Sequence, residues 1–406
     1  MPPSIETRTS WITASLSLVI LGVSYGAPWI VVVALKPIAA EMGGVRSVPS
    51  FASSLAWFGA AFGGIGMGWL ADRYGVRWTV MFGSVMIAIG LAISSLGQTW
   101  ELYLGHGLFI GLLGNSGLNA PLYVYVSRWF DRRRGSALAL IASGQYISGT
   151  IWPPIFESAI AGYGWRQTML VFGLLQVVVI LPIAIVVLRR PPEVVAPSAA
   201  SAEAEKPTVL GLPSVVVFTM LCIAAFCCCM PMSMPQVHLV ALCSDLGIKP
   251  AHGAAMLSVL LGTAFVSRQI WGAISDRIGG LLTVLIGSAW QFFSIAALAV
   301  TQDEIGLFTV TAIFGLGFSG IIPAYVLAVR ELFPAHEAGW RVPALLCFSG
   351  LGMASGGLFA GMLYDHFGYY APAFAAGLIF NLVNLGLIGT LVARRSGWFG
   401  PRLAYG

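Results

Sequence analysis

The chain has 406 residues, of which 58% are hydrophobic and only 9% are charged, and its formal net charge is +5. Soluble globular proteins carry about 25% charged residues, so the composition excludes an ordinary water-soluble domain. The apolar residues form long unbroken runs, whereas a membrane β-barrel alternates polar and apolar residues in segments of about ten. We therefore expect an all-α integral membrane protein.

Taken in chain order, twelve windows have the length of a membrane-spanning helix, which needs about 20 mostly apolar residues. The first window is longer than the apolar core of a secretory signal and lacks a convincing cleavage site, so we expect no cleaved leader. The windows predict helices at 11–35, 49–70, 78–97, 102–126, 136–160, 169–187, 213–242, 253–274, 281–300, 304–328, 340–363 and 372–392.

The substantial break between these windows is "RRPPEVVAPSAASAEAEKPTVLG", residues 189–211. Its Pro, Ala, Ser and Glu content cannot form a packed core and is typical of a flexible linker. The break divides the chain into an N-terminal bundle of six helices, residues 1–188, and a C-terminal bundle of six, residues 212–406. We expect the linker to lie in the cytoplasm.

Lys and Arg residues set the expected orientation in the membrane. With both termini and the linker in the cytoplasm, 16 of the 21 basic residues fall inside the cell, and only Arg268 falls within a span. This asymmetry obeys the positive-inside rule, so the net charge reflects topology and excludes a nucleic-acid partner. We expect a multi-pass protein of a bacterial inner membrane. The four basic residues expected outside are Lys36, Arg46, Arg166 and Lys249.

The two halves repeat one pattern. The string "GWLADRYGVRW" begins at Gly68 and partly matches "GAISDRIGG", which begins at Gly272, 204 positions later. Glu41 meets Asp245 at the same offset, and "PLYVYVSRWF" meets "PAYVLAVREL" at an offset of 202. Such duplication is typical of transporters built from two bundles with a substrate site between them near the bilayer midplane.

The first string resembles the signature loop G-x-L-A-D-R-x-G-x-R of the major facilitator superfamily. The resemblance extends over the whole chain and implies twelve transmembrane helices in two pseudo-symmetric six-helix bundles. Asp72 lies at a helix end, where it can cap a neighbouring helix or pair with an arginine. The alternative is that these charges only anchor the loop at the membrane surface. The residues expected to act in gating are Asp72, Arg73, Arg77, Asp276 and Arg277.

Three further matches resemble the monocarboxylate transporter family, on the bacterial side near oxalate and formate exchangers. "GVSYGAPWIVVVALK", residues 22–36, matches a pattern of its first helix, and "RWFDRRRGSALALIASGQYISG", residues 128–149, resembles its entry into helix 5. Arg268 lies where that family carries an arginine in helix 8 that receives the substrate carboxylate. The resemblance implies transport of a small carboxylate.

Arg268 is also unusual on physical grounds alone. An arginine in mid-helix costs about 2.5–3.5 kcal/mol on insertion scales, and at 1.5 Å per residue it lies roughly 12 Å inward from Asp276. The positions one turn away are Ala264, Phe265, Trp271 and Gly272, so no acid precedes or follows it on its own helix. A guanidinium in a water-filled cavity suits a carboxylate bidentately. The alternative is an arginine satisfied by carbonyls, hydroxyls and water.

Other polar residues are predicted to complete the substrate site. Asn119 lies roughly 13 Å before Arg128, where it can bond a hydroxyl or keto group, and Tyr25 and Trp29 share one helix face. His238 can carry a proton because its reference pKa is about 6.5, or it is a structural histidine. Each tyrosine has the alternative of a packed ring. The other candidates are Tyr123 and its repeat partner Tyr325, and Gln145 and Tyr146, of which one is expected to face the cavity.

Two positions depart from the animal members of that family. Trp29 and Ala264 stand where those proteins carry a lysine and an aspartate implicated in proton coupling. A single fixed positive charge suits a monoanion, because a second carboxylate would lack a partner. We therefore expect a lactate- or pyruvate-like monocarboxylate to be carried with a proton. The alternatives are an organic-anion exchanger of the oxalate and formate type and a drug/proton antiporter.

The remaining expectations concern chemistry. No Ser/His/Asp arrangement, H-E-x-x-H motif or P-loop occurs in the chain, so an enzyme is not expected. The six cysteines include three consecutive ones that point in different directions on a helix, which suits neither a metal cage nor a disulfide framework. We expect no cofactor and no metal. The expected partners are the carboxylate, protons and the lipid bilayer, and the protein is expected to be a monomer.

Overall fold

A computed structural model describes residues 6–130, 133–188 and 208–396. It divides the chain into two compact units. The first unit joins Met1–Pro197 to Val237–Gly262, and the second joins Ser198–Gln236 to Thr263–Gly406. Residues 237–262 thus group with the N-terminal helices by contact, although the predicted bundle boundary lies at the linker. The boundaries 1–188, 189–211 and 212–406 remain a prediction.

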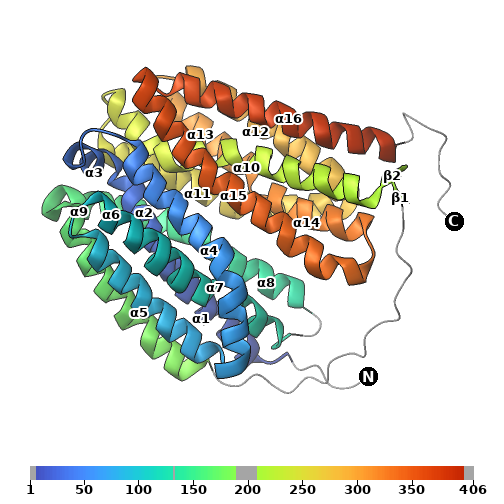
Figure 1. The fold of residues 1–406 in the computed structure, drawn as a ribbon, viewed down its shortest axis with the longest axis horizontal. Coiled ribbons are helices and arrows are strands. Elements are labelled where there is room, and N and C mark those ends of the chain that lie inside the picture. Colours follow the sequence, from blue (N-terminus) through green and yellow to red (C-terminus); the bar gives the residue numbers. More distant parts are fainter. Residues whose placement is uncertain (1–5, 131–132, 189–207, 397–406) are drawn as a thin grey trace. The chain divides into compact units, whose positions relative to one another are not determined.

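Helices make up nearly all of the first unit, and in Figure 1 α5 runs alongside the second half of α9. Its helices are α1 (Arg8–Ser24), α2 (Gly26–Val33), α3 (Leu35–Glu41), α4 (Ser47–Tyr74), α5 (Val76–Ser94), α6 (Thr99–Leu104), η1 (Gly105–Asn115), α7 (Ser116–Ser127), α8 (Arg134–Ala142) and α9 (Gly144–Val187). The last turns of α10 and the first half of α11 complete the unit.

The second unit repeats this organisation with fewer breaks. Its elements are β1 (Thr208–Val209), β2 (Leu212–Pro213), α10 (Ser214–Asp245), α11 (Pro250–Ile278), α12 (Gly280–Val300), α13 (Glu304–Phe318), α14 (Ile321–Leu332), α15 (Ala335–Phe367) and α16 (Ala371–Arg395). Helix α12 packs against α13, α14 and α16, as α5 packs against η1, α7 and α9 in the first unit, and both helices also carry exposed apolar side chains.

Every predicted span has a helical counterpart. Among the described residues nine helices are long and apolar enough to cross a bilayer, or ten if the bent helix at 47–74 counts as one. One of the nine, Ser136–Val187, contains two predicted spans, which separate at Gly164, where the backbone leaves the helical region. The predicted span 102–126 is divided among α6, η1 and α7.

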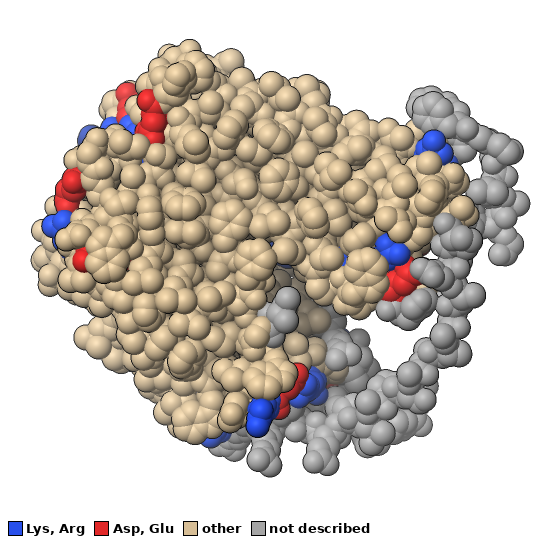
Figure 2. Space-filling view, viewed as in Figure 1, with Lys and Arg blue, Asp and Glu red and all other residues tan. Residues whose placement is uncertain are grey.

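The surface of the molecule is apolar over wide areas. Figure 2 shows a face on which charged side chains gather near helix ends and the area between them carries none. Large apolar side chains are exposed along the helices, including Phe293 at 70% and Leu174 at 67%. Exposed apolar surface of this extent is rare in soluble proteins but is expected where helices contact lipid tails, so it agrees with the multi-pass arrangement that the sequence predicts.

Backbone conformation confirms the internal repeat. Three pairs of glycines separated by 204 positions have positive φ angles in both copies. A residue with a side chain rarely adopts such angles, which glycine adopts without strain. Each pair marks the same event in its own half, namely the end of a helix or a sharp kink between two helices. The pairs are Gly43 (88°) with Gly247 (78°), Gly75 (90°) with Gly279 (81°), and Gly164 (80°) with Gly368 (82°).

A buried polar clamp is also repeated. In the first unit the Gln176 amide of α9 donates to the backbone oxygen of Ser84 on α5 over 2.6 Å. In the second unit the Asn381 amide of α16 donates to the backbone oxygen of Ser288 on α12 over 3.0 Å. Ser84 and Ser288 are 204 positions apart. One clamp joins α9 to α5 and the other joins α16 to α12, and neither exposes a polar group to lipid.

The fourth predicted span contains an unpredicted element. Residues 105–115 wind as a π-helix, η1, which is rare at this length. Glycines allow the neighbouring helices to approach it: a Cβ added at Gly59 or Gly63 of α4 would collide with η1 backbone atoms. Close backbone approach through small residues is a common way for membrane helices to associate.

The C-terminal end of the predicted linker is structured. Residues 189–207 lie outside them, but 208–213 form a small antiparallel hairpin in which Thr208 pairs with Pro213 and Val209 with Leu212. Leu210 and Gly211 both have positive φ, at 53° and 72°. This combination gives the tight turn that two-residue hairpins favour, so the end of the predicted linker is ordered at this point.

Gly356 tests the close packing of α15 against α10. A Cβ added there would collide with the backbone oxygen of Met230. We expect Gly356→Ala to lower the free energy of unfolding by about 1–3 kcal/mol, because overpacking forces the two backbones apart. Gly386→Ala on α16 is the matched control, since nothing lies within 4 Å of its added Cβ. Thermal unfolding in detergent would contradict this packing if both variants melted alike.

Candidate functional site

Arg268 lies in the middle of α11, away from its lipid-exposed side. Val266 and Ile270 are exposed at 55% and 54%, and each is two positions from Arg268, which at 100° per residue places them on the opposite side of the helix. Arg268 itself is half-buried. The Arg268 side chain therefore leaves α11 on the side opposite the face that exposes apolar side chains.

Polar contacts beside Arg268 fix the orientation of α11. Trp271 donates its indole N–H to the backbone oxygen of Leu316 on α13 over 2.7 Å. The Ser267 hydroxyl lies 2.7 Å from that of Ser319 and 3.2 Å from the backbone oxygen of Gly315. Because Ser267 and Trp271 lie one turn apart on the same face of the helix, their contacts hold α11 against rotation about its own axis.

Tyr25 and Asn119, two predicted site residues far apart in sequence, are in contact within the first unit. The Asn119 amide on α7 donates a short hydrogen bond to the Tyr25 hydroxyl at the junction of α1 and α2. The buried Asn119 Oδ1 accepts no hydrogen bond in the described structure, and neither does the Oδ1 of Asn115, one turn earlier. Since buried acceptors are normally satisfied, this stretch of η1 and α7 offers two acceptor atoms to a bound molecule or water.

Trp29 is 7% exposed and has a packing role within the first unit. Its ring covers Gly149 of α9, where an added Cβ would lie 3.0 Å from a ring atom. The indole therefore fills space between α2 and α9. Gln145 and Tyr146 lie one turn earlier on α9, just after the break at Ser143, and both are half-buried.

The two tyrosines related by the repeat have different surroundings. Tyr325 on α14 is completely buried, and its hydroxyl donates to Asn384 of α16 over 2.6 Å. Asn384 in turn donates to Asn381, the residue of the polar clamp. Tyr123 on α7 is half-buried. The structure thus places the Tyr325 hydroxyl in a buried network of the second unit, whereas Tyr123 keeps accessible surface.

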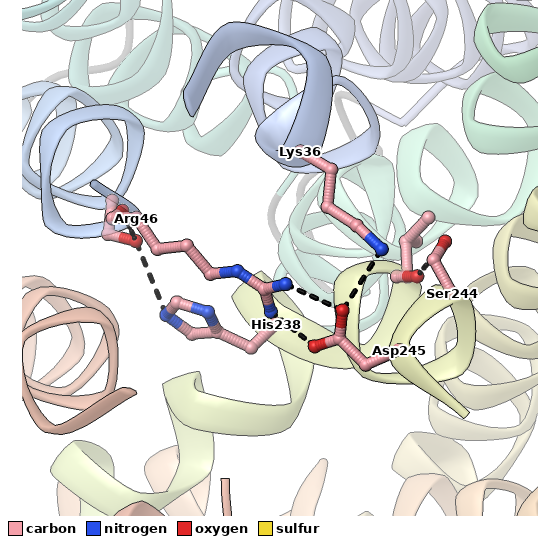
Figure 3. A network of polar contacts seen from close by, with 7 residues as sticks. Lys36, Arg46, His238, Ser244 and Asp245 are labelled. Atoms are coloured by element: carbon pink, nitrogen blue, oxygen red, sulfur yellow. Dashed lines mark hydrogen bonds and ion pairs between the residues drawn. The ribbon is translucent and has the colours of Figure 1, made fainter. Parts of the chain in front are cut away.

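His238 is completely buried near the end of α10. Its Nε2 lies 3.4 Å from the Ser50 hydroxyl of α4, which donates to the backbone oxygen of Arg46 over 2.7 Å. Figure 3 shows His238 beside the Arg46 side chain, which reaches the carboxylate of Asp245. The predicted proton carrier therefore lies next to a charge cluster that sequence reasoning did not assign.

The predicted gating residues of the first unit meet at the end of α4. Asp72 forms an ion pair of 3.0 Å with Arg128, one of the two arrangements expected for it. Arg77 donates to the backbone oxygen of Leu188 over 3.1 Å, and the Arg73 guanidinium lies over the rings of Trp69 and Tyr74. These contacts hold the ends of α4, α7 and α9 together around Gly75.

The second copy of this loop is arranged differently. Asp276 and Arg277 are exposed, and no ion pair of either is found among the described residues. Glu331 takes the corresponding role, because its carboxylate accepts from the Gly280 N–H at the start of α12 and pairs with Arg395 at 2.6 Å. Sequence reasoning missed Glu331, although it directly follows the repeated arginine, Arg330.

Arg341 on α15 lies at the edge of a predicted span, and sequence reasoning did not select it as a site residue. It is 3% exposed and pairs with Glu337, one turn earlier, at 2.6 Å. Three aromatic rings surround its guanidinium at 4.1–4.9 Å, from Phe218, Phe333 and Trp340. A buried charge is stable only with such partners, so Arg341 anchors the ends of α10, α14 and α15.

Family comparison gives the identity that these features indicate. The chain matches the model of the Major Facilitator Superfamily over residues 17–339 and again over 221–398. It belongs to this superfamily. The overlapping second match agrees with the internal repeat, and membership makes the chain a multi-pass membrane protein of a transporter family, which confirms the expected fold class.

Curated relatives include both transporters named for monocarboxylates and others. Monocarboxylate transporter 13 of Bos taurus is 27% identical over 343 residues, covering 79% of this chain and 75% of the relative. The MFS-type transporter pynF of Aspergillus niger is 23% identical, covering 78% and 74%. The resemblance to monocarboxylate transporters noted from the sequence is thus confirmed, although at low identity.

Solved structures share the fold. A bacterial homolog to the human lysosomal transporter Spinster, in an inward-facing and occupied conformation, superposes with a TM-score of 0.75 at 15% identity over 96% of this chain and 98% of that one. A peptide transporter POT gives 0.71 at 16% identity, covering 94% and 95%. At these identities the likeness shows the fold alone, which is the twelve-helix major facilitator fold.

Removal of one hydroxyl tests the contact between Tyr25 and Asn119. We expect Tyr25→Phe to lower the free energy of unfolding by about 1–3 kcal/mol, because the buried Asn119 amide loses its acceptor. Tyr163→Phe is the control, since Tyr163 is 79% exposed. Equal melting temperatures for the two variants would show that the hydrogen bond contributes nothing.

Proposed function

We propose that the protein is a secondary transporter that carries a small monocarboxylate, such as lactate or pyruvate, together with a proton by alternating access. The observation that carries the proposal is Arg268, a guanidinium in the middle of a membrane-spanning helix, on the side opposite its exposed apolar residues. Its planar fork binds a carboxylate with two parallel hydrogen bonds. Similarity to monocarboxylate transporters supports the same cargo class.

The cargo is proposed to be a monoanion. Trp29 fills its place between helices with an uncharged ring. The basic residue of α15, Arg341, is neutralised by Glu337 within its own unit and is enclosed by aromatic rings. Neither position therefore supplies a second cation for a dicarboxylate, whose second charge would be costly to bury without a partner.

Polar groups of the first unit are proposed to recognise the rest of the cargo. Asn119 has an unsatisfied Oδ1, and Tyr25 holds its amide in place. We also assign Tyr123, Gln145 and Tyr146 to cargo contacts, since all three are half-buried. Tyr325 is proposed to act through the packing of α14, because its hydroxyl is bound to Asn384.

Proton coupling is proposed to use His238 or the cargo carboxylate itself. His238 is the histidine beside the charge cluster of Arg46 and Asp245, so a change in its charge is felt there. The chain is further proposed to be a monomer of a bacterial inner membrane with both termini in the cytoplasm. The gating residues Asp72, Arg73, Arg77, Asp276 and Arg277 would then lie on the cytoplasmic side.

Organic-anion exchange and drug/proton antiport are the alternative functions. Some relatives are named for export, such as the agnestins efflux protein of Paecilomyces divaricatus, which is 23% identical. An exchanger needs a second anion on the opposite side, whereas a symporter catalyses net uptake. Proteoliposomes loaded with buffer alone therefore distinguish net symport from obligatory exchange.

Arg268→Ala is expected to reduce lactate uptake into proteoliposomes by about 10- to 100-fold, the equivalent of a lost charge-assisted hydrogen bond of about 1.5–3 kcal/mol. Arg268→Lys is the matched control: it keeps the charge but loses the fork, so a partial loss is expected. Full uptake by the alanine variant would remove Arg268 from the cargo site and with it the proposed function.

His238→Gln is expected to abolish the stimulation of net lactate uptake by an inward proton gradient. Counterflow of lactate at equal pH should persist, because it exchanges one cargo molecule for another and needs no net movement of protons. Both rates are measured in the same vesicles with radiolabelled lactate. Stimulation equal to that of the unmodified protein would assign the proton to the cargo or to another residue.

A further inference from the structure

Asp245, the last residue of α10, is held by two cations of the first unit. Arg46 donates two parallel hydrogen bonds to its carboxylate, both of 2.6 Å, and the Lys36 ammonium lies 3.0 Å from Oδ1. Figure 3 shows the two side chains reaching the carboxylate from different helices. This is the geometry with which a guanidinium and an ammonium bind any free carboxylate.

The cluster differs in exposure from one end to the other. The Arg46 side chain is 8% exposed, that of Asp245 is 23% exposed and that of Lys36 is 39% exposed. The backbone of Arg46 is also held in place, because its carbonyl oxygen accepts a hydrogen bond from the Ser50 hydroxyl, which lies beside His238. Lys36 thus presents an accessible cation in front of a rigid, buried guanidinium.

A cavity of about 270 Å³ reaches the accessible side of this cluster. Its lining includes Lys36, Glu157 of α9 and Ser244, with apolar walls from Val33 and Val240. A cavity of this size holds several water molecules. A small organic anion with an apolar tail can therefore reach the Lys36 ammonium, and it would meet Glu157 as the one acidic side chain of that wall.

The repeat shows that this pairing is not required by the fold. Glu41 is the counterpart of Asp245. It forms an ion pair with Arg166 at 2.8 Å next to the kink of α9, and it accepts a hydrogen bond from the Trp165 indole N–H over 2.9 Å. The corresponding kink at Gly368 is followed by two tyrosines, so position 370 carries Tyr where Arg166 stands in the first half. Asp245 has lost that local partner and binds Lys36 and Arg46 instead.

We propose that Lys36 and Arg46 form an entry site for the cargo carboxylate, in which Asp245 is the resident substitute. An arriving carboxylate would take over the hydrogen bonds of Asp245, and the end of α10 would be released from α3 and from the start of α4. The arriving carboxylate makes the same hydrogen bonds that Asp245 gives up, so the cost of the exchange is that of leaving the Asp245 carboxylate, 23% exposed, to water. The proposal rests on the proposed carboxylate cargo and adds a second binding site, distinct from Arg268.

Asp245→Asn tests the site, because it removes the competing carboxylate and leaves both cations in place. We expect lactate to raise the melting temperature of the purified variant at about tenfold lower concentration than for the unmodified protein, the change expected of one charge-assisted hydrogen bond. The gain should be lost in Arg46→Gln/Asp245→Asn. It should persist in Arg268→Ala/Asp245→Asn, since the entry site does not use Arg268.

Glu41→Gln is the matched control. It removes an equal charge from the repeated position and releases Arg166, whose side chain is 49% exposed and contacts Glu41 through one nitrogen at 2.8 Å. Lactate should stabilise it no more than the unmodified protein. An equal gain in Glu41→Gln, no gain in Asp245→Asn, or loss of the gain when Arg268 is removed would each overturn the entry site. Failure of the proposed function is seen separately, as uptake that survives Arg268→Ala.

Lys36→Gln provides a second measurement that does not bury an unpaired charge. It leaves the pair of Arg46 and Asp245 intact and removes the accessible cation. We expect the KM for lactate added outside to rise several-fold with kcat unchanged, because the first encounter is weakened and later steps are not. An unchanged KM would contradict the entry site.

Discussion

The structure depends on one constraint: within the hydrocarbon of a bilayer a polar group must find its partner inside the protein. Serine and threonine hydroxyls meet it by donating to the backbone one turn earlier, as Thr150 and Thr283 do. The two polar clamps meet it between helices, through Gln176 and Asn381. Against this background the unsatisfied Oδ1 atoms of Asn115 and Asn119 are exceptions among the buried side-chain amides.

Much of the fold could be predicted because that constraint leaves its trace in the sequence. Long apolar windows gave the spans, and repeated strings indicated the duplication that the paired glycines confirm. The π-helix η1 could not be predicted, since its apolar, glycine-rich sequence is equally suited to an α-helix and the glycines of α4 and α5 that pack against it are distant in sequence. The hairpin at 208–213 was missed because the surrounding composition is that of a linker.

The candidate site was predictable only in part. Arg268 stands out because a mid-span charge is rare, and the contact between Tyr25 and Asn119 joins two residues selected for their depth. Glu331 and Asp245 were not selected, because acids at helix ends look like ordinary surface charges in a sequence. Their roles follow from partners 51 or more positions away, Gly280 for one and Arg46 for the other, which no local pattern reveals.

Two arginines show that surroundings and not residue type decide what a guanidinium does. Arg341 has an acid one turn away and a cage of three rings, so its charge is permanently neutralised and serves packing. Arg46 binds a carboxylate on another helix, together with Lys36, which lines a cavity, and this is the pair for which exchange with a cargo carboxylate is proposed. The two halves keep the same glycines where the chain turns, and they diverge at Arg166 and Tyr370, beside an acid. The glycines that turn the chain are thus the same in both halves, whereas the residue two positions after the third pair, Arg166 in one half and Tyr370 in the other, differs in charge.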